Sequence, residues 1–240
     1  MKRICLIVLA TFLIFCRSAL AYRDDYPPYS FKEGAYSQIQ SKLLTGNTKG
    51  EFRSDDGEKI TVSLKWANED SHFLLKKDGK VLMKAKDQAE FFPESVYQVN
   101  LDKNGFNDFI VFSGVPYGSG LGSHFGCVDI FLKSKRGKYR HVHYKSFDGG
   151  IEDFVDMNKD GRPEIILMSF YEAKKGNYFC YSIYEIKKWK LINADSKYKG
   201  FPKFIRYTNK KNDKNATQLT AKEKALHIKE VESKISYGST

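Results

Sequence analysis

Short apolar stretches separated by polar turns run through the middle of the chain, and this pattern predicts β-strands. Residues Ile60–Trp66 alternate apolar and polar side chains, as in a strand with one buried face. The apolar runs Phe109–Phe112 and Ile165–Met168 indicate strands that are buried on both faces. Three hairpins are predicted, namely His72–Leu75 with Val81–Lys84, Cys127–Leu132 with Tyr139–Tyr144, and Phe179–Ile186 with Trp189–Ile192. The sequence therefore predicts an all-β protein.

An acidic loop precedes each of the two apolar runs, and the two loops are 56 residues apart. The positions that align are Asn100, Asp102, Asn104, Gly105 and Asp108 with Asp156, Asn158, Asp160, Gly161 and Glu164. The strands and hairpins around the loops align as well, which indicates an internal repeat. Each unit contains a hairpin, a strand, the acidic loop, a buried strand and a long loop. We therefore expect repeated four-stranded antiparallel units over residues 58–207.

The first residues of the chain have the pattern of a signal peptide. Basic residues are followed by the apolar run Ile4–Phe15 and by the small-residue cleavage site Ser18–Ala21, which assigns residues 1–21 to the signal. The apolar run is about 12 residues long, whereas roughly 20 are needed to span a bilayer. We therefore expect a periplasmic or secreted protein with no transmembrane segment after cleavage.

Two further segments lie outside the repeat region. Residues 22–57 are expected to form an irregular N-terminal arm, in which Gln38–Leu44 is compatible with a turn of helix. Residues 208–240 are expected to form a polar linker and a C-terminal helix over Thr220–Ile235, with Thr220 as the N-cap. The apolar face of this helix is thin. It could dock on the sheet or on a partner, and a lightly held tail is the alternative.

Two cysteines, Cys127 and Cys180, remain after the expected cleavage. They occupy equivalent places in the two repeats, at the start of the strand that follows the long loop. Because an exported compartment is oxidising, two thiols there are usually paired. The sequence therefore predicts a Cys127–Cys180 disulfide, and two buried thiols are the alternative.

The second acidic loop has the composition of a calcium site. Asp156, Asn158 and Asp160 place side-chain oxygens at alternate positions, and a glycine allows a sharp turn after them. The main-chain carbonyl of Arg162 and the carboxylate of Glu164 would add further oxygens. Calcium takes about six to eight oxygen ligands and tolerates irregular geometry. We therefore expect calcium at this loop.

The loops differ from EF-hands, which need an acid at position 12 and a helix on each side. Position 12 is Val111 in the first loop and Leu167 in the second, and both lie in expected strands. An acid at position 9 followed by a strand resembles the FG-GAP/VCBS family, whose calcium-loop repeats occur in integrin-like propellers and in many bacterial secreted proteins. The resemblance covers about Val81–Ile192.

The resemblance implies a propeller-like arrangement and a set of ligands in each loop. A propeller usually has at least four blades, whereas this chain has room for about three, so an open arrangement is the alternative to a closed ring. The implied ligands are Asp156, Asn158, Asp160 and Glu164 in the second loop, and Asn100, Asp102, Asn104 and Asp108 in the first. The second loop has more carboxylates and is expected to bind calcium more tightly. A loop held by its own side-chain-to-backbone bonds, without an ion, is the alternative for either loop.

Histidines offer a different chemistry. His141 and His143 should point to one face of a strand, and with His124 or Asp129 they could bind a transition metal or serve a hydrolase. Two exposed strand residues are the alternative. The chain contains no HExxH, GxSxG, Walker or Cys-x-x-Cys motif.

The formal net charge of +11 indicates a basic surface that could meet anionic glycans, lipid head groups or nucleic acid, and a solvated basic protein is the alternative. We expect an unidentified protein or an anionic glycan as the partner and no specific nucleic acid. The sequence as a whole favours an exported, non-enzymatic β-repeat protein with structural calcium loops, which binds its partner through a basic surface. A hydrolase that uses His124, His141 or His143 is one alternative. An accessory subunit of an envelope complex is the other.

Overall fold

The structure is a computed structural model of the whole chain. It describes residues 37–38, 41–44, 51–53, 59–65, 72–77, 79–86, 92–114, 124–174, 176–207 and 219–239. The expected signal peptide, most of the N-terminal arm and the glycine-rich loop over residues 115–123 lie outside these described residues.

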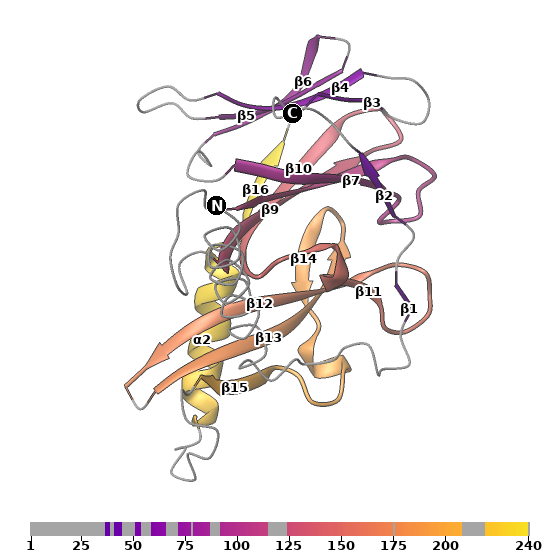
Figure 1. The fold of residues 1–240 in the computed structure, drawn as a ribbon. Helices are drawn as coiled ribbons and strands as arrows, with labels where there is room; N and C mark the ends of the chain where they lie inside the picture. The colour runs from indigo at the N-terminus through magenta and orange to yellow at the C-terminus, as the bar shows by residue number, and fades with distance from the viewer. Residues whose placement is uncertain are drawn as a thin grey trace, which may run out of the picture.

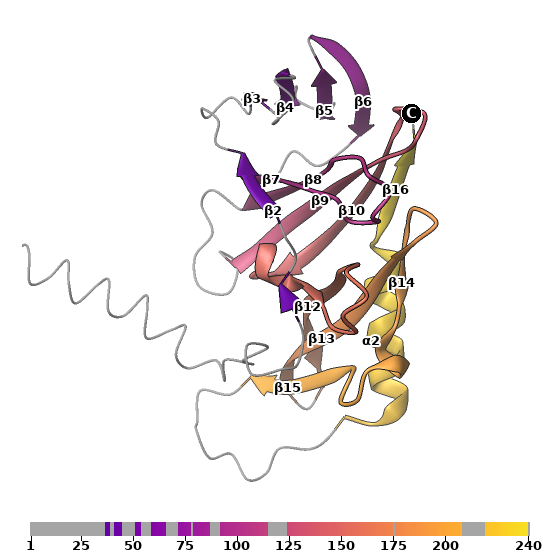
Figure 2. The same cartoon turned by 90° about the vertical axis from the view of Figure 1, so that its right-hand side faces the viewer.

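The described strands form three antiparallel sheets, arranged as successive layers in Figures 1 and 2. The first sheet contains β3 (Glu51–Arg53), β4 (Lys59–Lys65), β5 (His72–Lys77) and β6 (Lys80–Lys86). The second contains β2 (Ser41–Leu44), β7 (Phe92–Val99), β8 (Asp108–Gly114), β9 (Phe125–Lys133), β10 (Tyr139–Phe147) and β16 (Ser236–Ser239). The third contains β1 (Ser37–Gln38), β11 (Phe154–Asp156), β12 (Glu164–Ala173), β13 (Gly176–Lys187), β14 (Lys190–Asn193) and β15 (Lys203–Tyr207). The all-β, antiparallel prediction is confirmed.

Four consecutive strands pair in chain order within each sheet, as β3 to β6, β7 to β10 and β11 to β14. Local turn chemistry explains the hairpins. Gly137 has a positive φ of 76° in the turn between β9 and β10, a conformation that glycine adopts at no steric cost. Lys188 and Trp189 both have positive φ between β13 and β14, as in the two-residue turns whose twist suits a hairpin.

The largest apolar core lies between the second and third sheets. Ile110 and Val142 contribute from the second sheet, and Ile165 and Leu167 from the third. All four side chains are at most 1% exposed. The continuous apolar runs in the sequence thus correspond to strands that are covered on both faces, as their pattern predicts.

The C-terminal segment connects two sheets. Helix α2 (Ala221–Ser233) begins at Thr220, whose hydroxyl accepts a hydrogen bond from the Glu223 amide at 3.2 Å. The helix and its N-cap are therefore confirmed. His227 of α2 contacts Ser169 of the third sheet, and β16 then pairs with β10 of the second (Figure 2). The helix is docked on the sheet rather than held loosely.

Three sequence-based expectations are wrong. The segment expected as a turn of helix is extended at β2, which pairs with β7. The N-terminal arm also contributes β1 and β3 to sheets. The predicted disulfide is not formed, because Cys127 lies in the second sheet and Cys180 in the third, where each is a buried thiol. Equivalent positions in two successive sheets are separated by the layer spacing, and a disulfide needs Cα atoms within about 7 Å.

Candidate metal-binding sites

The two acidic loops have the same backbone conformation. Lys103 and Lys159 have positive φ angles of 55° and 60° at the equivalent position. Gly105 and Gly161 follow with φ of 85° and 75°. Each loop connects two neighbouring strands, β7 to β8 or β11 to β12. Side chains aligned in the sequence are therefore equivalent in space.

Side-chain-to-backbone bonds maintain the first loop. Asp102 Oδ1 accepts from the Asn104 amide at 3.2 Å, and Asn104 Oδ1 accepts from the Phe106 amide at 2.8 Å. The Asn104 side-chain amide donates to the Lys133 carbonyl at 2.7 Å, which attaches the loop to β9. These are Asx turns, and they recur in the second loop.

Asp108 closes the first loop. Its Oδ2 accepts from the Leu101 amide at 2.9 Å, and its Oδ1 accepts from the Lys133 amide at 2.7 Å. The side chain is fully buried, and burial raises its pKa to about 7, although the two hydrogen bonds act to lower it. Asn100, at the first position of the loop, is exposed. Both oxygens of the buried carboxylate are thus occupied by backbone donors.

The corresponding bonds of the second loop keep the 56-residue offset. Asn158 Oδ1 accepts from the Asp160 amide at 2.9 Å, and Asp160 Oδ1 accepts from the Arg162 amide at 2.7 Å. Glu164 Oε2 accepts from the Met157 amide at 2.8 Å, as Asp108 does in the first loop. Bonds within the chain thus hold this turn as they hold the first.

Asp156 distinguishes the second loop from the first. Its Oδ2 accepts from the Gly161 amide at 2.6 Å, so the carboxylate faces the loop. Its Oδ1 is buried and has no hydrogen-bond partner, and the residue is 7% exposed. A buried carboxylate oxygen without a donor is costly. In the first loop, by contrast, backbone amides bond both oxygens of the buried carboxylate.

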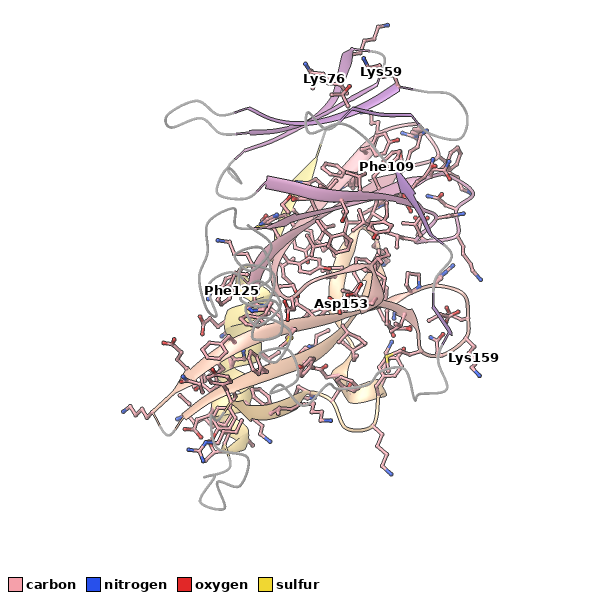
Figure 3. The ribbon with its side chains drawn as sticks, viewed as in Figure 1. Lys59, Lys76, Phe109, Phe125, Asp153 and Lys159 are labelled. Carbon is pink, nitrogen blue, oxygen red and sulfur yellow. The ribbon has the colours of Figure 1, made fainter. Side chains whose placement is uncertain are left out.

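Glu164 is the other buried carboxylate of the second loop. Its Oε1 accepts from the Asn158 side-chain amide at 3.1 Å. Burial raises the pKa of Glu164, although hydrogen bonds from Tyr198 and Met157 oppose this effect. Asp160, Asn158 and Arg162 are exposed, and Lys159 points outward at the molecular edge (Figure 3).

Lys103 connects the two loops, a contact that the sequence does not reveal. Its ammonium donates to the main-chain carbonyl of Asp160 at 2.7 Å. A Cβ atom at Gly161 would lie 1.9 Å from the Lys103 Nζ, so the glycine leaves room for this side chain. A positive charge from the first loop is therefore placed beside the carboxylates of the second.

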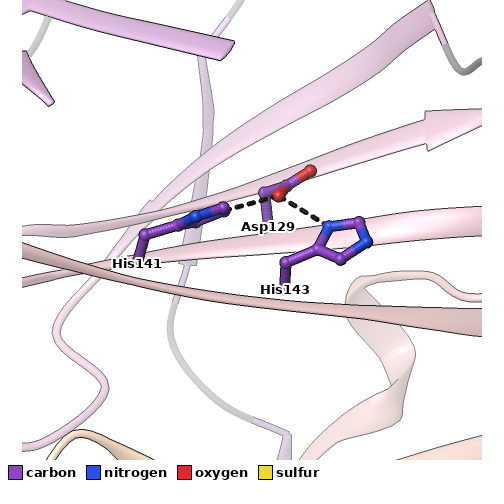
Figure 4. A group of neighbouring side chains, drawn as sticks. All are labelled: Asp129, His141 and His143. Atoms are coloured by element: carbon purple, nitrogen blue, oxygen red, sulfur yellow. Dashed lines mark hydrogen bonds and ion pairs between the residues drawn. The ribbon is translucent and has the colours of Figure 1, made fainter. Parts of the chain in front are cut away.

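The histidines form a separate group. Asp129 Oδ1 is 2.6 Å from His141 Nε2 and 2.8 Å from His143 Nδ1 (Figure 4). All three residues are at most 4% exposed, so the alternative of exposed strand histidines is wrong. His124 does not join them, because its Nδ1 pairs with Asp148 at 2.7 Å. Burial alone would raise the pKa of Asp129, but the two imidazole hydrogen bonds hold it below its ordinary value.

Sequence reasoning missed a small cavity under α2. The cavity has a volume of about 130 Å³ and is lined by residues of β10, β12 and the helix. His227 Nε2 lies 2.8 Å from Ser169 Oγ at its wall, and the ring stacks on Tyr171. Burial lowers the pKa of His227. The helical spacing of His227 with Val231 and Ile235 is the sequence signal that could have placed it on the docked face.

Within the described residues, none of the helical segments has both the length and the apolar character needed to cross a bilayer. Comparison with known proteins adds no relative: no family model matches the chain, and neither a curated protein nor a solved structure is detectably similar to it.

Proposed function

We propose that this chain is an exported, non-enzymatic β-repeat protein whose second acidic loop holds a structural calcium ion. One observation carries the proposal: the buried Asp156 Oδ1 has no hydrogen-bond partner, while the Asp156 Oδ2 accepts from the Gly161 amide of the same loop. The residues that would hold the ion are Asp156, Asp160 and Glu164, with Asn158 and the Arg162 carbonyl as further oxygen ligands.

The ion would act on folding rather than on a reaction. Calcium neutralises the loop carboxylates, which otherwise repel one another, and it ties the end of β11 to the start of β12. Because these strands pair directly, the ion would stabilise the third sheet. A ligand that binds only the folded protein stabilises it by mass action. The propeller-like arrangement of the three four-stranded units belongs to the same proposal.

Partner binding would use the basic surface. Lys135, Arg136 and Lys138 are exposed in the turn between β9 and β10. Lys187 and Lys188 are exposed at the equivalent turn between β13 and β14. Loops on a rigid sheet are common binding positions, and clustered cations attract acidic surfaces. The partner class that fits is an acidic protein or an anionic glycan.

Isothermal titration calorimetry with calcium tests the proposal. The wild-type protein should bind one calcium ion, with a dissociation constant on the order of 10⁻⁴–10⁻³ M, as is usual for extracellular modules. Asp156→Ala should remove the binding heat. Asn100→Ala, the matched change in the first loop, should leave it in place. Identical heats for wild type and Asp156→Ala would exclude calcium at the second loop.

A further inference from the structure

The group formed by Asp129, His141 and His143 is positioned by neighbouring strands of the second sheet. His143 of β10 pairs directly with Asp129 of β9, and His141 lies two residues earlier on β10. Side chains two residues apart on a strand point to the same face. Val142, between the histidines, points into the core shared with the third sheet. The histidines therefore point to the opposite face, on which the first sheet lies (Figures 1 and 4).

Aromatic packing fixes one of the rings. Phe131 pairs with His141 across the strands, and the two rings stack with centroids 4.9 Å apart and planes 14° apart. Phe131 is fully buried. On the neighbouring strand β8, Phe109 pairs with Phe131 and Val111 pairs with Asp129, so both side chains lie on this same face. Two imidazoles and a carboxylate are thus buried beside Phe109, Val111 and Phe131.

A buried carboxylate must be compensated, because burying an unpaired charge is very costly. Here both imidazoles aim a nitrogen at the same oxygen, Asp129 Oδ1. One potential ligand atom from each of the three residues lies within 4.8 Å of the others. A single imidazole would be enough to pair the Asp129 carboxylate, whereas two imidazoles are directed at it here.

The geometry matches the demands of a tetrahedral metal ion. With bonds of about 2.0–2.1 Å to nitrogen and oxygen, neighbouring ligand atoms lie about 3.3 Å apart. The observed N···O separations of 2.6 and 2.8 Å would need to widen by about 0.5–0.7 Å to admit the ion. Each imidazole would present a lone pair at this nitrogen and carry its proton on the other.

We propose that Asp129, His141 and His143 form a second metal site, selective for zinc or a similar divalent transition metal. Imidazole nitrogens favour such ions, whereas calcium and magnesium prefer all-oxygen ligand sets. Three protein ligands leave a fourth tetrahedral position for a small exogenous ligand. This site is independent of the calcium loop, since its residues lie on β9 and β10 of the second sheet rather than on the connection between β11 and β12 of the third.

The test begins with the wild-type protein after treatment with a chelator. Titration with Co²⁺ should produce the visible ligand-field absorption of a tetrahedral site, and Zn²⁺ should displace the cobalt at one ion per chain. His141→Ala and His143→Ala should each weaken zinc binding at least 100-fold. Because removal of a buried ligand can impair folding, His143→Gln provides a variant of more similar size, and circular dichroism establishes which variants are folded.

Two controls separate this site from other cation binding. His124→Ala alters a histidine outside the group and should bind zinc as the wild type does. Asp156→Ala removes the proposed calcium site and should also retain zinc binding. Wild-type protein that binds no zinc at 1:1 stoichiometry would overturn the proposal. Folded histidine variants that bind zinc as tightly as the wild type would overturn it as well.

Discussion

The two acidic loops share a backbone conformation, and the side chains at their first and ninth positions are bonded differently. At the first position, Asn100 is exposed, whereas Asp156 is buried with one oxygen unpartnered. At the ninth position, Asp108 is bonded through both oxygens to backbone amides. Glu164 accepts from the Met157 backbone amide and from the side chains of Asn158 and Tyr198. One loop is thus complete in itself, while the other leaves an oxygen for a cation.

This difference shows that the turn and the proposed ion site are separable. The Asx bonds and the positive-φ glycine occur in both loops, so they encode the turn alone. Ion binding would depend on the added carboxylate at position 1. A loop motif of this kind therefore serves mainly as a connection between two strands. We expect it to bind a cation only where a buried carboxylate lacks a hydrogen-bond donor from the protein.

The largest expected change in the free energy of unfolding comes from a substitution in the first loop. Asp108→Ala should lower the free energy of unfolding by about 2–5 kcal/mol, because each backbone donor left without a partner costs about 1–3 kcal/mol. The loss should be the same with and without calcium. Urea denaturation measures it, with Asn100→Ala as the exposed control, which should stay within about 0.5 kcal/mol of the wild type. Calcium rescue of Asp108→Ala would show that the first loop also binds the ion.

Calcium should stabilise the wild type strongly. At a free calcium concentration of 100 times the dissociation constant, the free energy of unfolding should rise by about 2.7 kcal/mol. Thermal melting with calcium and with a chelator measures this gain. Asp102→Ala should keep the gain, and Glu164→Gln should lose most of it. Equal gains in these two variants would contradict the assignment to the second loop.

The pH dependence of calcium affinity should reflect Glu164. Its burial raises the pKa, so the folded protein holds this proton at a higher pH than an ordinary glutamate does. Calcium binds the carboxylate form, and its affinity should therefore fall as the pH falls through the raised pKa, by up to about tenfold per pH unit. Titrations between pH 7.5 and pH 4.5 measure the slope. An affinity that stays constant until well below the ordinary pKa would contradict this role of Glu164.

The smallest expected effect concerns the contact between the loops. Lys103→Met removes the ammonium beside the second loop and should tighten calcium binding about three- to tenfold at low salt. The gain should shrink as salt is added, because screening weakens surface charge interactions. Lys159→Met, at the equivalent position of the second loop, is the control. It removes a charge that points outward, and its effect on calcium affinity should be smaller than that of Lys103→Met. A larger effect of Lys159→Met would show that the carbonyl contact of Lys103 is unimportant.

Local patterns were sufficient to predict most of the strands. The alternation at β4, the apolar runs at β8 and β12, and the turn before β10 all act over a few residues, where periodicity and turn chemistry are informative. Strands β2 and β16 were missed because they are short and pair with residues far away in the chain, such as Ser236 with His143. Their conformation is set by these tertiary partners rather than by their own sequence.

The sites were predictable only in part. The alignment of Asp102 with Asn158 and of Asp108 with Glu164 identified the two loops and their equivalent positions. It could not reveal that the main-chain amide of Lys133, on the next strand, donates a hydrogen bond to the Asp108 carboxylate. Strand geometry predicted that His141 and His143 share a face, but it left His124 and Asp129 as alternative partners. The burial of the histidines could not be predicted, because it depends on which layer covers that face of the sheet.

Equilibrium dialysis with calcium tests the difference between the loops most directly. Wild-type protein should bind one calcium ion per chain. Asp156→Asn keeps an oxygen that can accept from the Gly161 amide but removes the carboxylate charge, and it should bind none. Asp102→Asn, which removes a carboxylate from the first loop, should still bind one. Two ions in the wild type, or one ion retained by Asp156→Asn, would contradict the assignment of calcium to the second loop alone.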